Sequence, residues 1–143
     1  MDLPDTSVWI AIAIQAHPFH AQTTAWFALP HAHASILFCR AVQQSFLRLL
    51  TTEAIMRPYG VLPYSNAGAW QLFDSFLADP RISFASEPRN LESHWKTFTA
   101  RNTASPKLWM DAYLAAFALA GGHRLITTDH AFSQFKNLNL LVL

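Results

Sequence analysis

The stretch SPKLWMDAYLAAFALAGGHRLITTDHAF, residues 105–132, contains a helix signal followed directly by a strand signal. Ser105 is a typical N-cap with a proline in the next position, and the Ala- and Leu-rich run predicts a helix over residues 106–120. Gly121–Gly122 ends that helix, and the β-prone run RLITT predicts a strand over residues 124–128. A helix that leads through a tight turn into a strand is typical of α/β proteins.

The same alternation extends over the rest of the chain. Further short strands are predicted before Asp5 and over residues 34–39, 81–85 and 138–143. Further helices are predicted over residues 8–15, 20–28, 41–52, 66–78 and 88–101. Parallel neighbours need crossover connections, so single strands separated by helices predict one α/β domain over residues 1–143, with a parallel β-sheet flanked by α-helices on both faces.

Composition narrows the class of protein. Hydrophobic residues make up 52% of the chain and charged residues 13%, against about 25% charged in typical soluble domains. The surplus of apolar residues favours a protein partner, and a homodimer is one such assembly. The formal net charge of +1, with Lys and Arg scattered singly, does not by itself predict a nucleic-acid ligand.

Cysteine usage and the length of apolar runs bear on the compartment. Cys39 is the single cysteine, so no internal disulfide can form and nothing indicates an oxidising compartment. The longest apolar runs, such as residues 8–14, fall well short of the ~18 residues that a membrane span needs. We therefore expect a cytoplasmic protein with no membrane segment.

Three of the nine acidic residues stand out by their position. Asp5 and Asp129 each follow a predicted strand, so in a parallel sheet both would lie at the carboxyl ends of the strands, where ligands bind. Asp111 lies in the predicted helix beside its stripe of apolar residues, on or near the face that packs against the domain. The three side chains are therefore candidates for one site.

Each aspartate alone has a simpler explanation as a helix N-cap or turn former. Together, three carboxylates at one rim repel one another and need a cation, shared protons or basic partners. Oxygen ligands suit Mg²⁺ or Mn²⁺ rather than zinc. A site of this kind on a parallel α/β sheet usually serves phosphate chemistry, because the ion neutralises phosphoryl oxygens and activates water.

Two segments, LPDTSVWIAIA (3–13) and LWMDAYLAAFALAGGHRLITTDHAFSQF (108–135), resemble the PIN-domain nucleases, and specifically the VapC-type toxins of bacterial toxin–antitoxin pairs. Three motifs carry the resemblance: D-T-S after the first strand, D-A-x-L-A-A in the helix, and T-T-D-x-x-F after the next strand. The order of elements matches over essentially the whole chain.

The resemblance implies a metal-dependent endoribonuclease that hydrolyses RNA phosphodiester bonds, acts as the toxin of a type II toxin–antitoxin system, and is inhibited by a VapB-like antitoxin. By motif, Asp5, Asp111 and Asp129 are the acids that bind Mg²⁺ or Mn²⁺. Ser7 and Thr128 stand beside them in the motifs, as hydroxyls that orient the carboxylates or bound water.

One position departs from the family pattern. The family usually has a fourth acid, a Glu, at the start of the helix after the second strand, and this place aligns with Gln43 in CRAVQQSFLRLL. A Gln carbonyl can ligate a cation or hold a water, so we expect it to complete the pocket, but it brings no negative charge. A catalytically degenerate PIN domain that binds RNA or an antitoxin without cleaving is therefore an alternative.

Two further alternatives concern single residues. A haloacid-dehalogenase-like phosphatase also begins with an Asp after its first strand, but it requires a second Asp at the place that Ser7 holds here. Arg48, flanked by apolar residues in SFLRLL, is a candidate contact for an RNA phosphate, with a structural salt bridge as the competing explanation.

Overall fold

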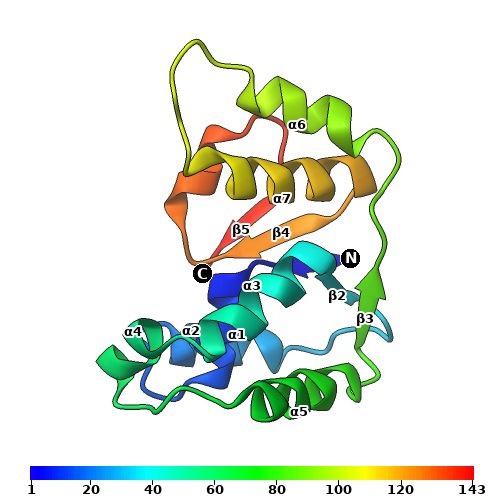
Figure 1. Cartoon of the computed structure of the whole chain (residues 1–143). Coiled ribbons are helices and arrows are strands. Elements are labelled where there is room, and N and C mark those ends of the chain that lie inside the picture. Colours follow the sequence, from blue (N-terminus) through cyan, green and yellow to red (C-terminus); the bar gives the residue numbers. More distant parts are fainter.

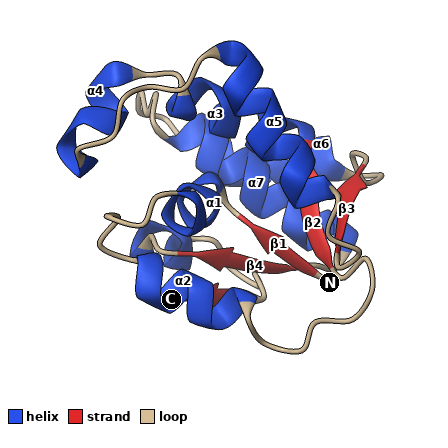
Figure 2. Cartoon of the chain, turned by 90° about the horizontal axis from the view of Figure 1, so that it is seen from below, coloured by secondary structure: helices blue, strands red, loops and turns tan.

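A single sheet organises the chain. The computed structural model describes all 143 residues, and five strands form the sheet in the order β3-β2-β1-β4-β5, every neighbouring pair being parallel. The strands are β1 (Asp2–Pro4), β2 (Ile36–Cys39), β3 (Ile82–Ala85), β4 (Arg124–Thr127) and β5 (Leu140–Val142). Figure 2 shows β1 in the middle, between β2 and β4. The predicted parallel sheet is confirmed.

Helices cover both faces of this sheet (Figure 1). On one side lie α1 (Thr6–Ala13), α2 (His20–Phe27), α3 (Arg40–Leu50), α4 (Glu53–Met56) and α5 (Asn66–Leu77). On the other side lie α6 (Leu91–Thr99) and α7 (Leu108–Gly121). Two short 3-10 helices, η1 (Arg57–Tyr59) and η2 (His130–Gln134), occur in connections. All six predicted helices are present, and the short α4 is an element that the sequence pattern did not predict.

The sequence predicted one end of α7 correctly and the other end wrongly. Gly122 follows the helix with φ of 64°, a left-handed conformation that glycine adopts without strain, so the predicted stop is confirmed. The predicted N-cap is wrong. Ser105 forms a turn instead, its carbonyl accepting from the Leu108 N–H at 3.0 Å, and no side chain caps the helix, which begins at Leu108.

Small side chains bring α7 close to the sheet. Four alanines of this helix are completely buried. They are Ala112, Ala115, Ala116 and Ala118. Leu108, Leu114 and Phe117 of the same helix are also buried, and at the alanine positions the helix can approach its neighbours more closely than leucines would allow. The position of the first turn of α7 is therefore fixed by contacts further along the same helix.

Aromatic residues fill the other side of the sheet. Every residue of β2 is buried, and the Trp9 ring of α1 stacks on Phe38 with 4.0 Å between ring centroids. Phe46 of α3 and Phe73 of α5 surround this pair and are themselves buried. Most of the apolar surplus is thus core, but some remains outside: Leu62 is 86% exposed. None of the helices has the length and hydropathy needed to cross a membrane.

Candidate functional site

Asp5 lies between β1 and α1 and serves as the N-cap of α1. Its Oδ1 accepts hydrogen bonds from the Val8 backbone N–H at 3.0 Å and from the Ser7 hydroxyl at 2.6 Å. Its Oδ2 accepts from the Thr127 hydroxyl at 2.5 Å. Burial raises the pKa of the Asp5 carboxyl, and the hydrogen bonds from Ser7 and Thr127 oppose that rise. The carboxylate is therefore buried but held in one orientation.

The end of β4 connects to Asp5 through hydroxyls. Thr127 is fully buried, donates to Asp5, and accepts from the Asp129 backbone N–H at 2.9 Å. The single hydroxyl proton of Ser7 goes to Asp5, so the Thr128 hydroxyl donates to Ser7, over 2.7 Å. Asp129 itself caps η2 by accepting a backbone N–H. Asp5 and Asp129 thus lie beside one another at the carboxyl ends of adjacent strands.

Asp111 reaches the same place from the first turn of α7. Its side chain is half-buried and makes no hydrogen bond or ion pair within the chain. Burial raises its pKa, and the negative charges of Asp129 and Asp5 raise it further. The charges of Asp5 and Asp129 therefore disfavour the charged form of Asp111.

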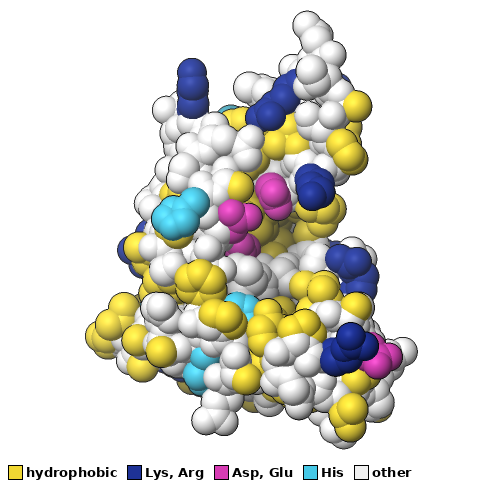
Figure 3. Space-filling view, turned by 90° about the vertical axis from the view of Figure 1, so that its left-hand side faces the viewer, with side chains coloured by type: hydrophobic (Ala, Val, Ile, Leu, Met, Phe, Trp, Pro, Cys, Tyr) yellow, Lys and Arg dark blue, Asp and Glu magenta, His cyan; other side chains and the backbone are white.

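The three aspartates line one pocket of about 220 Å³, which we call the acid pocket. Its other lining residues are Thr6, Ser7, Ala41, Val42, Ser45, Met110, Leu114 and Phe132. Figure 3 shows acidic side chains at the edge of a hollow with hydrophobic side chains in its floor. None of the three acids is paired with Lys, Arg or His, since the ion pairs of the chain all lie elsewhere.

The donor atoms of the acid pocket fit a hard cation by their chemistry, because they are carboxylate and hydroxyl oxygens. As the side chains lie, no three His, Cys, Asp or Glu residues are grouped closely enough to hold an ion between them. Mg²⁺ usually keeps several waters and takes only one or two carboxylates directly. The arrangement therefore suits a partly hydrated ion better than a closed protein cage.

Gln43 lies outside the acid pocket. It is buried, and its side-chain oxygen accepts a hydrogen bond from the Arg40 guanidinium one turn earlier in α3. Its neighbours Val42 and Ser45 line the pocket instead. The expectation that the Gln43 side chain completes this pocket is corrected by the structure, because successive helix residues are rotated by about 100°.

Arg48 lies in the last turn of α3, exposed to solvent. It lines a separate hollow together with Trp70, and that hollow shares no residue with the acid pocket. No acidic side chain pairs with it, so the structural salt bridge considered from the sequence is absent. A contact between Arg48 and RNA stays a prediction.

Two residues of this region were missed by the sequence reasoning. Thr127 joins Asp5 to the backbone of Asp129, and its signal was the first Thr of T-T-D, next to the Thr128 that was chosen. Ser45 lines the pocket from α3, and nothing in the sequence distinguished it from its neighbours.

Comparison with known proteins identifies the family. The model of the family described as "PIN domain" matches residues 3–138. "Ribonuclease VapC41" of Mycobacterium tuberculosis is 47% identical over 144 aligned residues, covering 100% of this chain and 99% of that protein. "Ribonuclease VapC43" of the same species is 31% identical over 101 residues, 68% of this chain and 64% of that protein.

Solved structures share the fold at lower sequence identity. VapBC2 from Rickettsia felis, bound to a DNA fragment from its promoter, superposes with a TM-score of 0.66 at 12% identity, covering 99% of this chain and 98% of that one. VapC20 of Mycobacterium tuberculosis, a Sarcin-Ricin loop cleaving toxin, gives 0.65 at 18% identity, covering 97% and 98%. Fold, motifs and full-length identity agree, and the chain belongs to the PIN-domain family and, within it, to the VapC ribonucleases.

Proposed function

We propose that this chain is an endoribonuclease that hydrolyses RNA phosphodiester bonds and acts as the toxin of a type II toxin–antitoxin pair. The observation that carries the proposal is the gathering of Asp5, Asp111 and Asp129 at one pocket without a basic partner. Carboxylates that are close together and partly buried raise one another's pKa values, and such perturbed groups cluster at functional sites. The identity to a protein named as a VapC ribonuclease supports the same function.

Mg²⁺ or Mn²⁺ is the cofactor that we propose for this site, held by Asp5, Asp111 and Asp129. A divalent ion supplies charge neutralisation at the phosphoryl oxygens and acidifies a bound water. The protein supplies the rest. Asp5 is fixed by three donors, whereas Asp111 has no hydrogen-bond partner and is free to turn towards a ligand.

Ser7 and Thr128 have a positioning role in this proposal. The chain of hydroxyls from Thr128 through Ser7 to Asp5 fixes one carboxylate oxygen, and Thr127 fixes the other. A carboxylate has about four acceptor sites; Oδ1 uses two of them for Val8 and Ser7, so the site left for a ligand is the second one of Oδ2. These hydroxyls therefore set the direction in which Asp5 presents its remaining acceptor site.

The partners that we propose are a VapB-like antitoxin and a second copy of the chain. A solved relative of the same fold is a VapBC complex, and its fold likeness is compatible with an antitoxin partner here. Large apolar side chains such as Leu62, Trp70 and Met110 are exposed in the single chain. Exposed apolar surface of this kind favours a protein partner.

A degenerate domain that binds RNA without cleaving is the second candidate. The observation in its favour is that the acid pocket contains three carboxylates and no fourth, with Gln43 turned away from it. The two candidates differ in one measurable property, which is turnover of RNA.

The test is cleavage of structured and unstructured RNA by the purified chain in Mg²⁺, in Mn²⁺ and in EDTA. Asp111→Asn, purified identically, controls for contaminating nucleases. Cleavage that needs a divalent ion and is lost in Asp111→Asn supports the nuclease. Wild type and Asp111→Asn that are equally inactive but bind RNA would establish the degenerate domain instead.

A further inference from the structure

We infer that RNA leaves the acid pocket along a groove whose cations bind its phosphates, formed by Lys107, Arg101 and Lys136; we call this groove the cationic track. The inference rests on the proposed function, since it names the path of the same substrate. No motif in the sequence groups these three residues, which come from the segment before α7, the segment after α6, and the segment after η2.

The cationic track is connected to the acid pocket by shared lining residues. Asp111 and Asp129, two of its acids, also line a neighbouring hollow of about 560 Å³ that contains Lys107 and Arg101. Arg101 in turn lines a further hollow of about 540 Å³, which extends to Lys136. The three hollows therefore form a series in which each shares lining residues with the next, from the acids to Lys136.

The cations of the track are available to bind a ligand. The three ion pairs of the chain use Arg81, Lys96 and Arg124, so none of the track cations is neutralised by an acidic side chain. All three track residues are exposed. One guanidinium nitrogen of Arg101 donates to the Gln134 side-chain oxygen at 3.0 Å, which orients the group while leaving its other donors free.

The N-terminus of α7 lies at the track. This helix of 14 residues begins at Leu108 with no side-chain cap, and Pro106, Lys107 and Leu108 all line the first hollow of the track. The first N–H groups of a helix have no partner within it, and the helix dipole favours an anion there. A phosphate beside Lys107 would therefore meet a second source of positive potential.

The cations of the track are spread over two hollows, with polar side chains such as Ser105, Thr97 and Asn137 in the same lining. Such a spread suits the repeating phosphates of a nucleic acid. A single-stranded nucleic acid is held by cations that follow its backbone in this way, with sequence-tolerant affinity. Figure 3 shows Lys and Arg side chains on the ridges around the hollow that holds the acids.

The experiment measures binding of a labelled oligouridine in EDTA, where cleavage is prevented, over a range of salt concentrations. Each lost phosphate contact lowers the magnitude of the slope of log K against log[salt] by about 0.7 for a single strand. We expect this decrease for Lys107→Gln, Arg101→Gln and Lys136→Gln. Arg89→Gln is the matched control, because Arg89 is an exposed cation that lines none of the hollows named above.

Further variants and a competitor separate the outcomes. Lys107→Arg keeps the charge and should keep the wild-type slope, and melting curves establish that every variant is folded. If the wild-type chain cleaves RNA but the three Gln variants have the same slope as Arg89→Gln, the track is overturned and the proposed function stands. A wild type that neither binds nor cleaves RNA overturns the proposed function together with the track. Displacement of the oligouridine by polyglutamate as readily as by unlabelled oligouridine overturns the assignment to RNA.

Discussion

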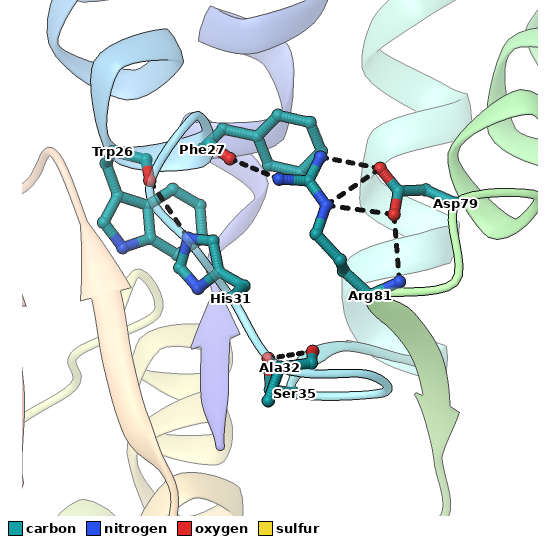
Figure 4. A network of polar contacts seen from close by, with 7 residues as sticks. All are labelled: Trp26, Phe27, His31, Ala32, Ser35, Asp79 and Arg81. Atoms are coloured by element: carbon teal, nitrogen blue, oxygen red, sulfur yellow. Dashed lines mark hydrogen bonds and ion pairs between the residues drawn. The ribbon is translucent and has the colours of Figure 1, made fainter.

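The two ends of the sheet use the same residue type, aspartate, in opposite ways. At the amino ends of the strands, Asp2 accepts two hydrogen bonds from Arg124, at 2.9 and 2.7 Å. Asp79, just before β3, is bound by Arg81 in the same manner, and Figure 4 shows this guanidinium also donating to the Phe27 carbonyl. At the carboxyl ends, Asp5, Asp111 and Asp129 have no cationic partner.

The difference separates structural from functional acids. Hydrogen bonds from Arg81 lower the pKa of Asp79, so its charge favours the folded state. Burial and the neighbouring acids raise the pKa of Asp111, so its charge opposes folding. Only the second kind of carboxylate gains from a cation supplied from outside, and this contrast can be tested by changing one acid at each end.

The largest expected effect is on RNA cleavage. Asp129→Asn should lower the rate at least ~100-fold, the lower end of what the loss of one electrostatic group costs an active site. Asp79→Asn should leave the rate unchanged at a temperature where both variants are folded. Initial rates on the same RNA in Mn²⁺ test this, and equal losses in the two variants would contradict the division between the two ends.

At the amino ends of the strands, the property that should change is the stability of the fold. Arg81→Gln removes a charge-assisted pair that is about three-quarters buried, and we expect the free energy of unfolding to fall by about 1–2 kcal/mol at neutral pH. The pKa of Asp79 is depressed in the folded state, so its contribution is present above pH 3.8 and is lost as the pH falls through the folded-state pKa. Urea denaturation at several pH values measures this: the part of the deficit due to the ion pair should disappear in strong acid, whereas the part due to the lost contact with Phe27 should persist. A deficit that does not change with pH would exclude a contribution from the ion pair.

Asp111→Asn should stabilise the protein in EDTA. Its carboxyl has a raised pKa in the folded state, so the cost of its charge is complete above that pKa and vanishes as the pH falls to 3.8. The half-buried side chain is partly screened by solvent, so the relief is at most about 1 kcal/mol, which raises the Tm by no more than about 2–4 °C in a domain of this size. Thermal melts at neutral and acidic pH check the sign, and a lower Tm for the variant would show that the repulsion is already compensated.

The smallest effects are expected away from the acid pocket. Gln43→Glu should change cleavage by less than about threefold, because position 43 faces Arg40, with which a glutamate would form a local helix pair worth a few tenths of a kcal/mol. A large gain in activity would show instead that position 43 reaches the pocket when substrate binds. Arg48→Gln, in its separate hollow, should likewise have little effect on the cleavage rate.

The sequence predicted those parts of the molecule that depend on local pattern. The strands were predicted from short apolar runs, and Asp5 and Asp129 were placed at strand ends because each follows such a run. The bridge from Thr127 to Asp5 spans 122 positions and depends on which strands become neighbours. The direction of Gln43 depends on the rotation of α3 about its axis, which core packing sets and no motif records. The cations of the track are likewise brought together only by the fold.

The buried alanines of α7 limit which amino-acid substitutions this protein can accept during evolution. Four alanines of the helix that carries Asp111 are completely buried, so none of them has room for a larger side chain. Substitution by a bulkier residue at any of them would displace the helix and the acid with it, although none touches the acid pocket. Amino-acid substitutions should therefore accumulate slowly at the buried positions of this helix. They should be more frequent in exposed segments such as the one containing Leu62.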